Sequence, residues 1–176
     1  VDDWHPDERY LAIRNRPEEG TRIKLGAEGE RQVGVQEDTL ARAIDDWIAD
    51  VRPDVTDEHD RAPLIATQHG RMHPTGIAKV CYKITRPCVV TDECPHGRDI
   101  DECDATAAKH ASKCPSSRGP HALRRAAISH HLASDVPKEI VSARMSVSQP
   151  VLDEHYDARD EEQRRQNRAR HLDKLD

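Results

Sequence analysis

The segment 121–156 constrains the fold of this chain more than any other part of the sequence. Gly119-Pro120 is a typical helix start, and apolar residues follow it at helical spacing. Asp135-Val136-Pro137 ends that helix and starts a second one over 137–145. A short third helix is expected over about 148–157. The C-terminal part of the chain is therefore predicted to consist of consecutive helices joined by short loops.

Three side chains of this segment together suit phosphate chemistry. His121 and Arg124 are spaced so that both project from one face of a helix. The planar guanidinium of Arg124 can hold two phosphate oxygens, and His121 can donate to the same phosphate or exchange a proton near neutral pH. Tyr156 stands in a polar setting, whereas Tyr10 is expected on a strand and Tyr82 inside a helix. The pattern predicts that Arg and His bind a phosphodiester and that the Tyr156 hydroxyl attacks its phosphorus.

A hairpin is predicted near the start of the chain. Residues 9–15 and 29–35 read as two strands with partial alternation, joined by a Gly-rich, charged connection that contains Lys24. Arg22 and Arg31 flank this lysine. From spacing alone, Lys24 is a solvated loop residue.

The order His-x-Leu-Arg, helix, short loop, helix, Tyr, with a Lys in an upstream hairpin, resembles the C-terminal catalytic domain of the tyrosine recombinases, or phage integrases. The resemblance covers most of the chain. It implies a site-specific DNA recombinase that works through a 3′-phosphotyrosine intermediate, as a homo-oligomer on double-stranded DNA and without a cofactor for catalysis. It implies that Tyr156 is the nucleophile, that Arg124 and His121 bind the phosphate, and that Lys24 protonates the leaving oxygen.

Four more arginines are candidates for contacts with the DNA backbone, and simple solvent exposure is the alternative for each. They are Arg22, Arg31, Arg71 and Arg125.

The chain departs from the family pattern at two places. Val147 stands where the family usually has His or Trp, and Ser146, Ser148 and His155 are candidates to supply the missing hydrogen bond. The first catalytic Arg of the family would precede Val1, as would the N-terminal DNA-binding domain. These departures leave open an alternative, a truncated DNA-binding integrase remnant that does not cut DNA.

The middle of the chain is expected to supply core elements. A helix over 38–51 with Asp38 as its cap, a short buried strand over 64–67 and a helix from Pro74 to about Thr85 are predicted. The apolar face of the first helix is predicted to comprise Leu40, Ala43, Ile44, Trp47, Ile48 and Val51.

Four cysteines fall in the polar segment 86–117, which we call the Cys-rich segment, with the spacing C-x5-C-x8-C-x10-C. A loop of this length and polarity does not hold itself together by packing, whereas four thiolates around Zn²⁺ would organise it. His96 and His110 are substitute ligands, and a linker with incidental cysteines is the alternative. The predicted structural zinc ligands are Cys88, Cys94, Cys103 and Cys114.

The composition of the chain is unusual for a globular protein. Charged residues make up 34% of the 176 residues, aromatic residues only 3%, and Phe is absent. Excess acid with scarce Lys is typical of a protein adapted to high salt or of a GC-rich coding sequence. No signal peptide or membrane-length apolar run is present, which predicts a cytoplasmic, nucleoid-associated protein. We expect an α+β, mainly α fold, with residues 1–157 as one domain that includes the Cys-rich segment. Residues 158–176 are expected to form a charged, solvated tail, and packing on a neighbouring protomer, as the resemblance implies, is the alternative. A zinc-stabilised module unrelated to DNA is a third interpretation.

Overall fold

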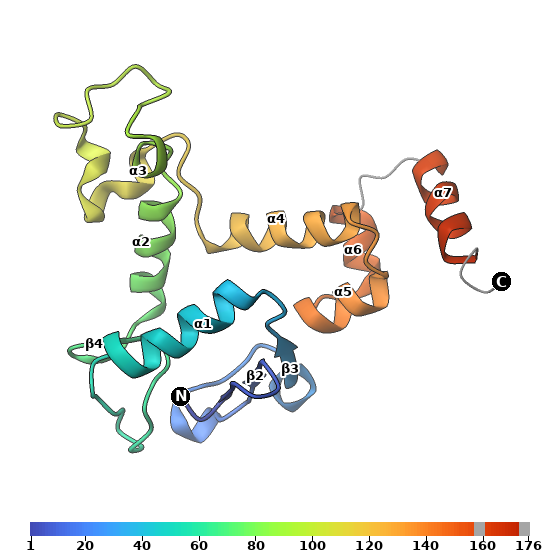
Figure 1. Cartoon of the computed structure of the whole chain (residues 1–176), viewed down its shortest axis with the longest axis horizontal. Coiled ribbons are helices and arrows are strands. Elements are labelled where there is room, and N and C mark those ends of the chain that lie inside the picture. Colours follow the sequence, from blue (N-terminus) through green and yellow to red (C-terminus); the bar gives the residue numbers. More distant parts are fainter. Residues whose placement is uncertain (157–160, 173–176) are drawn as a thin grey trace. The chain divides into compact units, whose positions relative to one another are not determined.

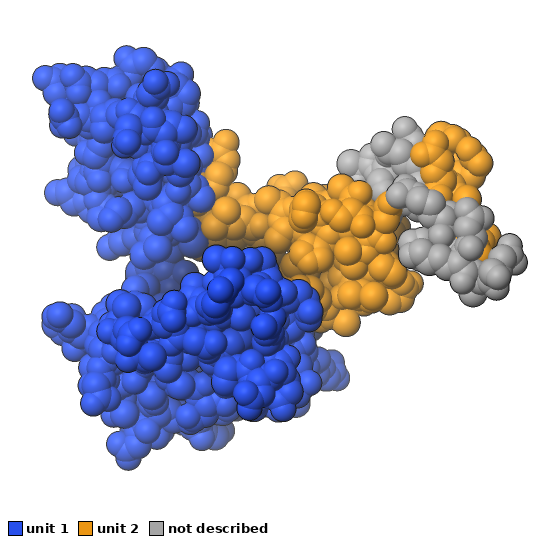
Figure 2. Space-filling model, in the orientation of Figure 1, with its two compact units in different colours: residues 1–117 blue, residues 118–176 orange. Residues whose placement is uncertain are grey.

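The structure, a computed structural model, describes residues 1–156 and 161–172. The chain divides into two compact units, Val1–Ser117 and Arg118–Asp176, which Figure 2 colours separately. Helices and a small antiparallel sheet make up the fold, so the predicted α+β class is confirmed. Within the described residues, no helix combines the length and the apolar character needed to span a bilayer.

The first unit (unit 1) contains two small sheets, three α-helices and several short helical turns (Figure 1). Its elements are β1 (Trp4–His5), β2 (Tyr10–Ile13), η1 (Pro17–Glu19), η2 (Gly26–Gly29), β3 (Arg31–Gly34), α1 (Asp38–Asp46), η3 (Trp47–Val51), β4 (Ala66–Thr67), β5 (Gly70–Arg71), α2 (Pro74–Ile84), α3 (Cys88–Thr91), η4 (Asp104–Thr106) and η5 (Ala108–Lys113).

The predicted hairpin is confirmed as the antiparallel pair β2–β3, in which Leu11 lies opposite Val33. The structure adds β1, which pairs with β2 through Trp4 opposite Leu11 and gives the strand order β1-β2-β3. The sheet needs this third strand because a lone two-stranded hairpin is only marginally stable in water. Trp4 is buried, and its indole N–H donates to Asp45 of α1 at 2.7 Å.

Helix α1 packs on the sheet with a face that matches the predicted one only in part, because Ile44 and Ile48 of the predicted stripe reach the core whereas other members do not. Ala41 is buried with Trp4 and Val35, and Ile44 and Ile48 pack against them. Large apolar residues assigned to the buried stripe are instead exposed, namely Leu40 at 52% and Val51 at 63%.

The start of α1 also differs from the prediction. Glu37 is its N-cap, and the carboxylate accepts hydrogen bonds from the backbone N–H groups of Thr39 and Leu40. Asp38, the predicted cap, is the first helical residue and pairs with Arg9. A longer Glu side chain one residue earlier reaches the same first-turn donors, which leaves Asp38 free to bind Arg9.

Helix α2 begins and ends as predicted, because Pro74 occupies its first turn with its φ already suited to a helix. The predicted strand over 64–67 is shorter and forms a small hairpin, β4–β5. The Trp47 indole N–H donates to the Leu64 carbonyl at 2.7 Å, so Trp47 is a structural residue that ties η3 to the segment before β4.

In the second unit (unit 2), every secondary-structure element of the described residues is a helix (Figure 1). Its core contains four fully buried side chains, Ile128, Leu132, Val141 and Leu152. The helices predicted from the sequence are confirmed, and the short loop between the first two includes Asp135 with φ of 60°. They are α4 (Pro120–Ala133), α5 (Lys138–Met145), α6 (Gln149–His155) and α7 (Glu161–Leu172). The predicted charged tail, 158–176, contains α7, whereas 157–160 and 173–176 lie outside the described residues.

Candidate active site and cysteine pocket

The first turns of α4 carry His121 and Arg124, as predicted. Gly119 precedes the helix and provides no side-chain cap, and the first turn contains no acidic residue. The unpaired N–H groups at this end of a helix carry partial positive charge. Both side chains are exposed. The start of α4 is therefore a cationic surface, to which the exposed Arg125 adds a further positive charge.

Arg124 binds backbone carbonyls instead of a carboxylate. Its Nη2 donates to the carbonyl oxygens of Met145 and Ser146, at 2.5 Å and 3.4 Å. These carbonyls lie at the C-terminal end of α5, where the helix dipole is negative and Ser146 adopts a left-handed conformation with φ of 47°. No described carboxylate forms an ion pair with Arg124, so no fixed negative charge opposes an anion at its guanidinium.

Tyr156 ends α6 and packs on the core of unit 2. Its ring is only partly buried and lies against the cluster formed by Ile128, Leu132, Val141 and Leu152, together with Met145 and others. Among the described residues, none forms a hydrogen bond with its hydroxyl. Arg124 and Tyr156 therefore both neighbour the connection between α5 and α6, one through its carbonyls and the other through the apolar cluster.

Val147 stands where the tyrosine recombinases, which the sequence resembles, usually have a His or Trp ring. It packs against the same core cluster, and its carbonyl accepts a hydrogen bond from Ser142 at 2.7 Å. Of the predicted substitutes, Ser146 and Ser148 flank it, and His155 lies beside Glu154 at 3.7 Å. The packing explains why an apolar residue is accepted at 147, but it gives the site no additional donor there.

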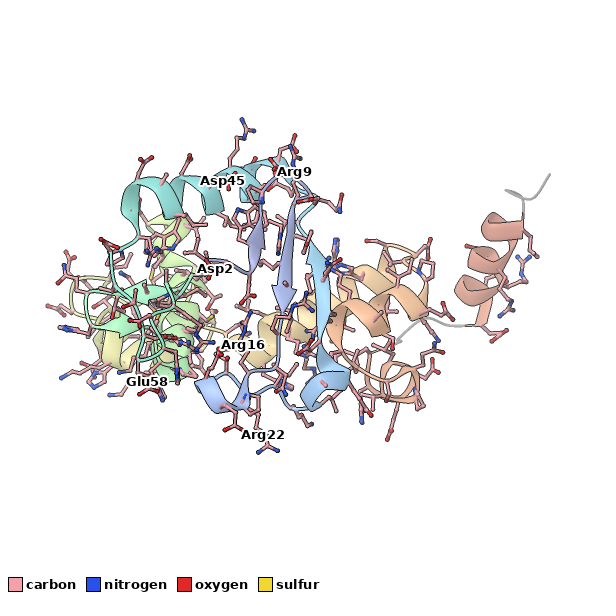
Figure 3. The ribbon with its side chains drawn as sticks, turned by 90° about the horizontal axis from the view of Figure 1, so that it is seen from below. Asp2, Arg9, Arg16, Arg22, Asp45 and Glu58 are labelled. Atoms are coloured by element: carbon pink, nitrogen blue, oxygen red, sulfur yellow. The ribbon has the colours of Figure 1, made fainter. Side chains whose placement is uncertain are left out.

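Lys24 lies in unit 1, in the connection between β2 and β3, as the sequence predicted. It is exposed and has no described hydrogen-bond or ion-pair partner. Arg22 is likewise exposed and extends from the ribbon away from Arg16 (Figure 3). Arg31 differs, because it donates to the carbonyl of Gly29 at 2.8 Å.

Arg71, predicted as a phosphate contact, pairs with Asp57. The same carboxylate accepts from Arg61 at 2.9 Å and from the backbone N–H of His59 at 3.0 Å. Burial alone would raise the pKa of Asp57, but the hydrogen bonds from Arg61, His59 and Arg71 outweigh it and hold that pKa well below its usual range. Contact of Arg71 with DNA would compete with this ion pair.

The four cysteines of the Cys-rich segment line one small pocket in unit 1. Its volume is about 10 Å³, which is about the room that one water-sized species needs. All five cysteines of the chain are free thiols, and the fifth, Cys81, lies on α2 outside this pocket. The pocket thiols are Cys88, Cys94, Cys103 and Cys114.

The thiols surround the pocket without forming a coordination sphere. Within residues 1–156 and 161–172, no three His, Cys, Asp or Glu side chains are arranged closely enough to hold a metal ion. His96, a predicted substitute ligand, lines the pocket, but its Nε2 is hydrogen-bonded to Ser116 Oγ at 3.0 Å. His110, the other substitute, is not among the residues that line the pocket.

The Cys-rich segment has almost no hydrophobic core. Its buried side chains are those of Ala105, Ala111, Arg86 and Ser117. Removing a methyl group from water gains only about 0.8 kcal/mol, whereas fixing the backbone of one residue costs about 1–2 kcal/mol. Apolar burial is therefore too small to account for the order of this segment.

Arg86 is the residue of this pocket that the sequence pattern does not reveal. It is 5% exposed, and its guanidinium donates to the carbonyls of Lys83 and Ala105. No carboxylate within the described parts of the chain forms an ion pair with it. The sequence offers one signal, the position of this arginine directly before Pro87-Cys88, but arginine is normally an exposed residue.

A comparison of the chain with models of known families, with curated proteins and with solved structures finds no match.

Proposed function

We propose that this chain is a catalytic part of a site-specific DNA recombinase of the tyrosine type. The observation that carries the proposal is the arrangement within unit 2. His121 and Arg124 project from the uncapped end of α4, the Arg124 guanidinium reaches the α5–α6 connection, and Tyr156 packs beside that connection. Exposed cations, helix-end N–H groups and a nearby phenol suit the attack of a tyrosine on a phosphodiester.

In the proposed reaction the Tyr156 oxygen attacks the phosphorus of a DNA strand. The bond from phosphorus to the tyrosine oxygen forms, the bond to the 5′-oxygen breaks, and a 3′-phosphotyrosine and a free 5′-hydroxyl result. The phenol loses its proton, and the leaving oxygen gains one. A 5′-hydroxyl of a second strand then reverses the step and releases the tyrosine, so phosphoester bonds are exchanged without a net input of energy.

Each cation has a defined part in this proposal. A free phenol has a pKa of about 10, so its ionisation at neutral pH needs positive charge nearby. Arg124 supplies that charge and binds two phosphate oxygens, which also stabilises the charge that develops on phosphorus. His121 donates to the phosphate or accepts the phenol proton. Lys24 of unit 1 protonates the leaving oxygen, a role that rests on the family resemblance.

The apolar packing of Tyr156 sets a condition on this mechanism. Its ring must turn partly away from the core cluster for the hydroxyl to reach a phosphate held by Arg124. Partial exposure of the residue supports such a movement. The chemistry uses no metal or nucleotide, so a Zn²⁺ ion held by the four pocket thiols is structural in this proposal.

A suicide substrate tests the proposal. A duplex nicked close to the cleavage position loses its short 5′-hydroxyl fragment by diffusion, which traps the covalent complex. We expect a protein–DNA adduct on a denaturing gel with the wild-type chain and none with Tyr156→Phe. Tyr82→Phe is the matched control, since it removes the same hydroxyl from α2 and leaves the adduct unchanged. Unaltered binding of the duplex by Tyr156→Phe shows that the loss is chemical.

An integrase remnant that only binds DNA is the second candidate, and Val147 is the observation that favours it. An apolar side chain at this position removes a hydrogen-bond donor that the family uses. In that case the duplex is bound, no adduct forms with the wild-type chain, and Arg124→Ala weakens binding of the duplex. An adduct that survives in Tyr156→Phe would contradict both candidates.

A further inference from the structure

We propose that the pocket of the Cys-rich segment binds one Zn²⁺ ion through Cys88, Cys94, Cys103 and Cys114, and that Arg86 balances the charge of the resulting site. The inference does not depend on the proposed recombinase function. It concerns a metal site in unit 1 whose role is to order the residues between α2 and Ser117.

The four thiols of the Cys-rich segment converge on one cavity. Residues spread over 88–114 are brought to one cavity that is large enough for a single small species. An organic cofactor does not fit there, and all four cysteines are free thiols, so disulfides do not account for their grouping. Four cysteine ligands are the set that structural zinc sites favour.

Arg86 is a buried cation beside this cavity. A buried guanidinium without a counter-ion is unfavourable, because its carbonyl partners neutralise none of its charge. Zn²⁺ with four thiolates is a dianion. Arg86 and Arg98 both line the pocket, so the two arginines supply the charge that a four-thiolate site lacks. This complementarity favours a four-cysteine site over a site that uses neutral His96, whose Nε2 binds Ser116.

The Cys-rich segment is weakly packed. Its buried groups are two alanines, one serine and the arginine, while Val89 and Val90 are 45% and 80% exposed. A chain segment of this kind depends on cross-links for its order, and metal binding supplies folding free energy directly. Within the described residues no three such side chains are close enough to hold an ion, so zinc binding requires the four thiols to move closer together.

Metal analysis of the purified full-length chain is the first test. We expect about one Zn²⁺ per chain by mass spectrometry of the metal, and loss of that ion in each of Cys88→Ser, Cys94→Ser, Cys103→Ser and Cys114→Ser. Cys81→Ser is the matched control because Cys81 lies outside the pocket, and it is expected to retain the ion. Zinc content that is unchanged by the four pocket substitutions, or absent from the wild type, overturns the proposal.

Two measurements on folded protein keep the test decisive if a serine variant fails to fold. With Co²⁺ in place of Zn²⁺, the wild-type chain should show sulfur-to-metal charge-transfer and tetrahedral d–d absorption. In addition, maleimide should label Cys81 alone until a zinc chelator is added, after which all five cysteines react.

The part played by Arg86 is tested separately. Arg86→Gln should lower zinc affinity about tenfold or more, whereas Arg98→Gln, at an exposed position, should change it less. Octahedral cobalt absorption, or equal labelling of the five thiols before and after chelation, would overturn the four-cysteine site.

Discussion

Asp57 lies in the loop before β4, and its carboxylate accepts several of the hydrogen bonds that hold this loop. It accepts hydrogen bonds from Arg61, Arg71 and the backbone of His59, and Arg61 also reaches Glu19 at 2.6 Å. Several cations and N–H groups share the two oxygens of this carboxylate, so a change at Asp57 affects all of these hydrogen bonds together. Arg71 is consequently a structural residue of this loop.

Asp57→Asn should lower the thermal unfolding midpoint at pH 7, since the amide loses the charge that binds both arginines. The pKa of Asp57 is lowered in the folded state, so its stabilising contribution is present above the unfolded value of about 3.9 and is lost as pH falls through the folded pKa. The difference between wild type and variant should therefore shrink below about pH 4. Melting curves over a pH series measure this.

Asp54→Asn provides the comparison for that experiment, because Asp54 is exposed and has no described partner in the same loop. It should follow the wild type at every pH. An Asp57→Asn deficit that stays constant from pH 7 to acid, or one shared by Asp54→Asn, would contradict the linkage to the Asp57 carboxylate.

At the scale of elements, the packing of α6 on the core of unit 2 depends mainly on one residue, Leu152. Leu152 is fully buried with Ile128, Leu132 and Val141, and the same cluster supports the Tyr156 ring. Leu152→Ala should reduce the free energy of unfolding of unit 2 by about 2–5 kcal/mol through lost transfer energy and a cavity. Val151→Ala, at a neighbouring position that is 36% exposed, should cost less than about 1 kcal/mol. Chemical denaturation followed by circular dichroism compares the two variants, and equal losses would contradict the assigned core.

Elements with strong local signals were predictable from the sequence. Pro74 and Pro120 mark helix starts, the α4–α5 break coincides with Asp135-Val136-Pro137, and alternation indicated β2 and β3. Strand β1 was missed because two residues carry no periodicity, and its pairing depends on contacts that are distant in sequence. Local signals therefore determine most helices here, whereas the third strand of the sheet depends on tertiary packing.

The buried face of α1 shows a different limit. A sequence stripe favours large apolar side chains, but the surface that α1 covers admits small Ala41 beside Trp4, and Leu40 is left exposed. Which face is buried depends on the shape of the partner sheet. The same contrast between local signals and tertiary contacts holds in the candidate active site. The helical positions of His121 and Arg124 were predictable from the sequence, but the contacts of Arg124 with backbone carbonyls were not.

At the scale of the whole molecule, the net charge and the local distribution of charge have different consequences. The chain carries 33 acidic and 27 basic residues, for a net charge of −6. DNA binding by an acidic protein requires cations concentrated where phosphates bind, as at the start of α4. At about 1 M salt the Debye length is about 3 Å, against about 10 Å at 0.1 M, so remote acidic groups then oppose binding very little.

The same screening should stabilise the fold. Asp46 and Asp50 are exposed, one helical turn apart, and neither forms an ion pair with a described residue, so their repulsion is reduced by salt. Exposed ion pairs also weaken in salt, but the net charge of −6 leaves an excess of repulsion over attraction for salt to screen. We therefore expect the unfolding midpoint to rise from about 0.1 M to about 1 M KCl, and the rise to be smaller in the double variant Asp46→Asn, Asp50→Asn. Sucrose of equal osmolality separates screening from solute exclusion, because it strengthens burial without ions and should affect both proteins alike. A midpoint that falls with KCl, or rises equally in both proteins, would show that repulsion between these acids does not limit stability.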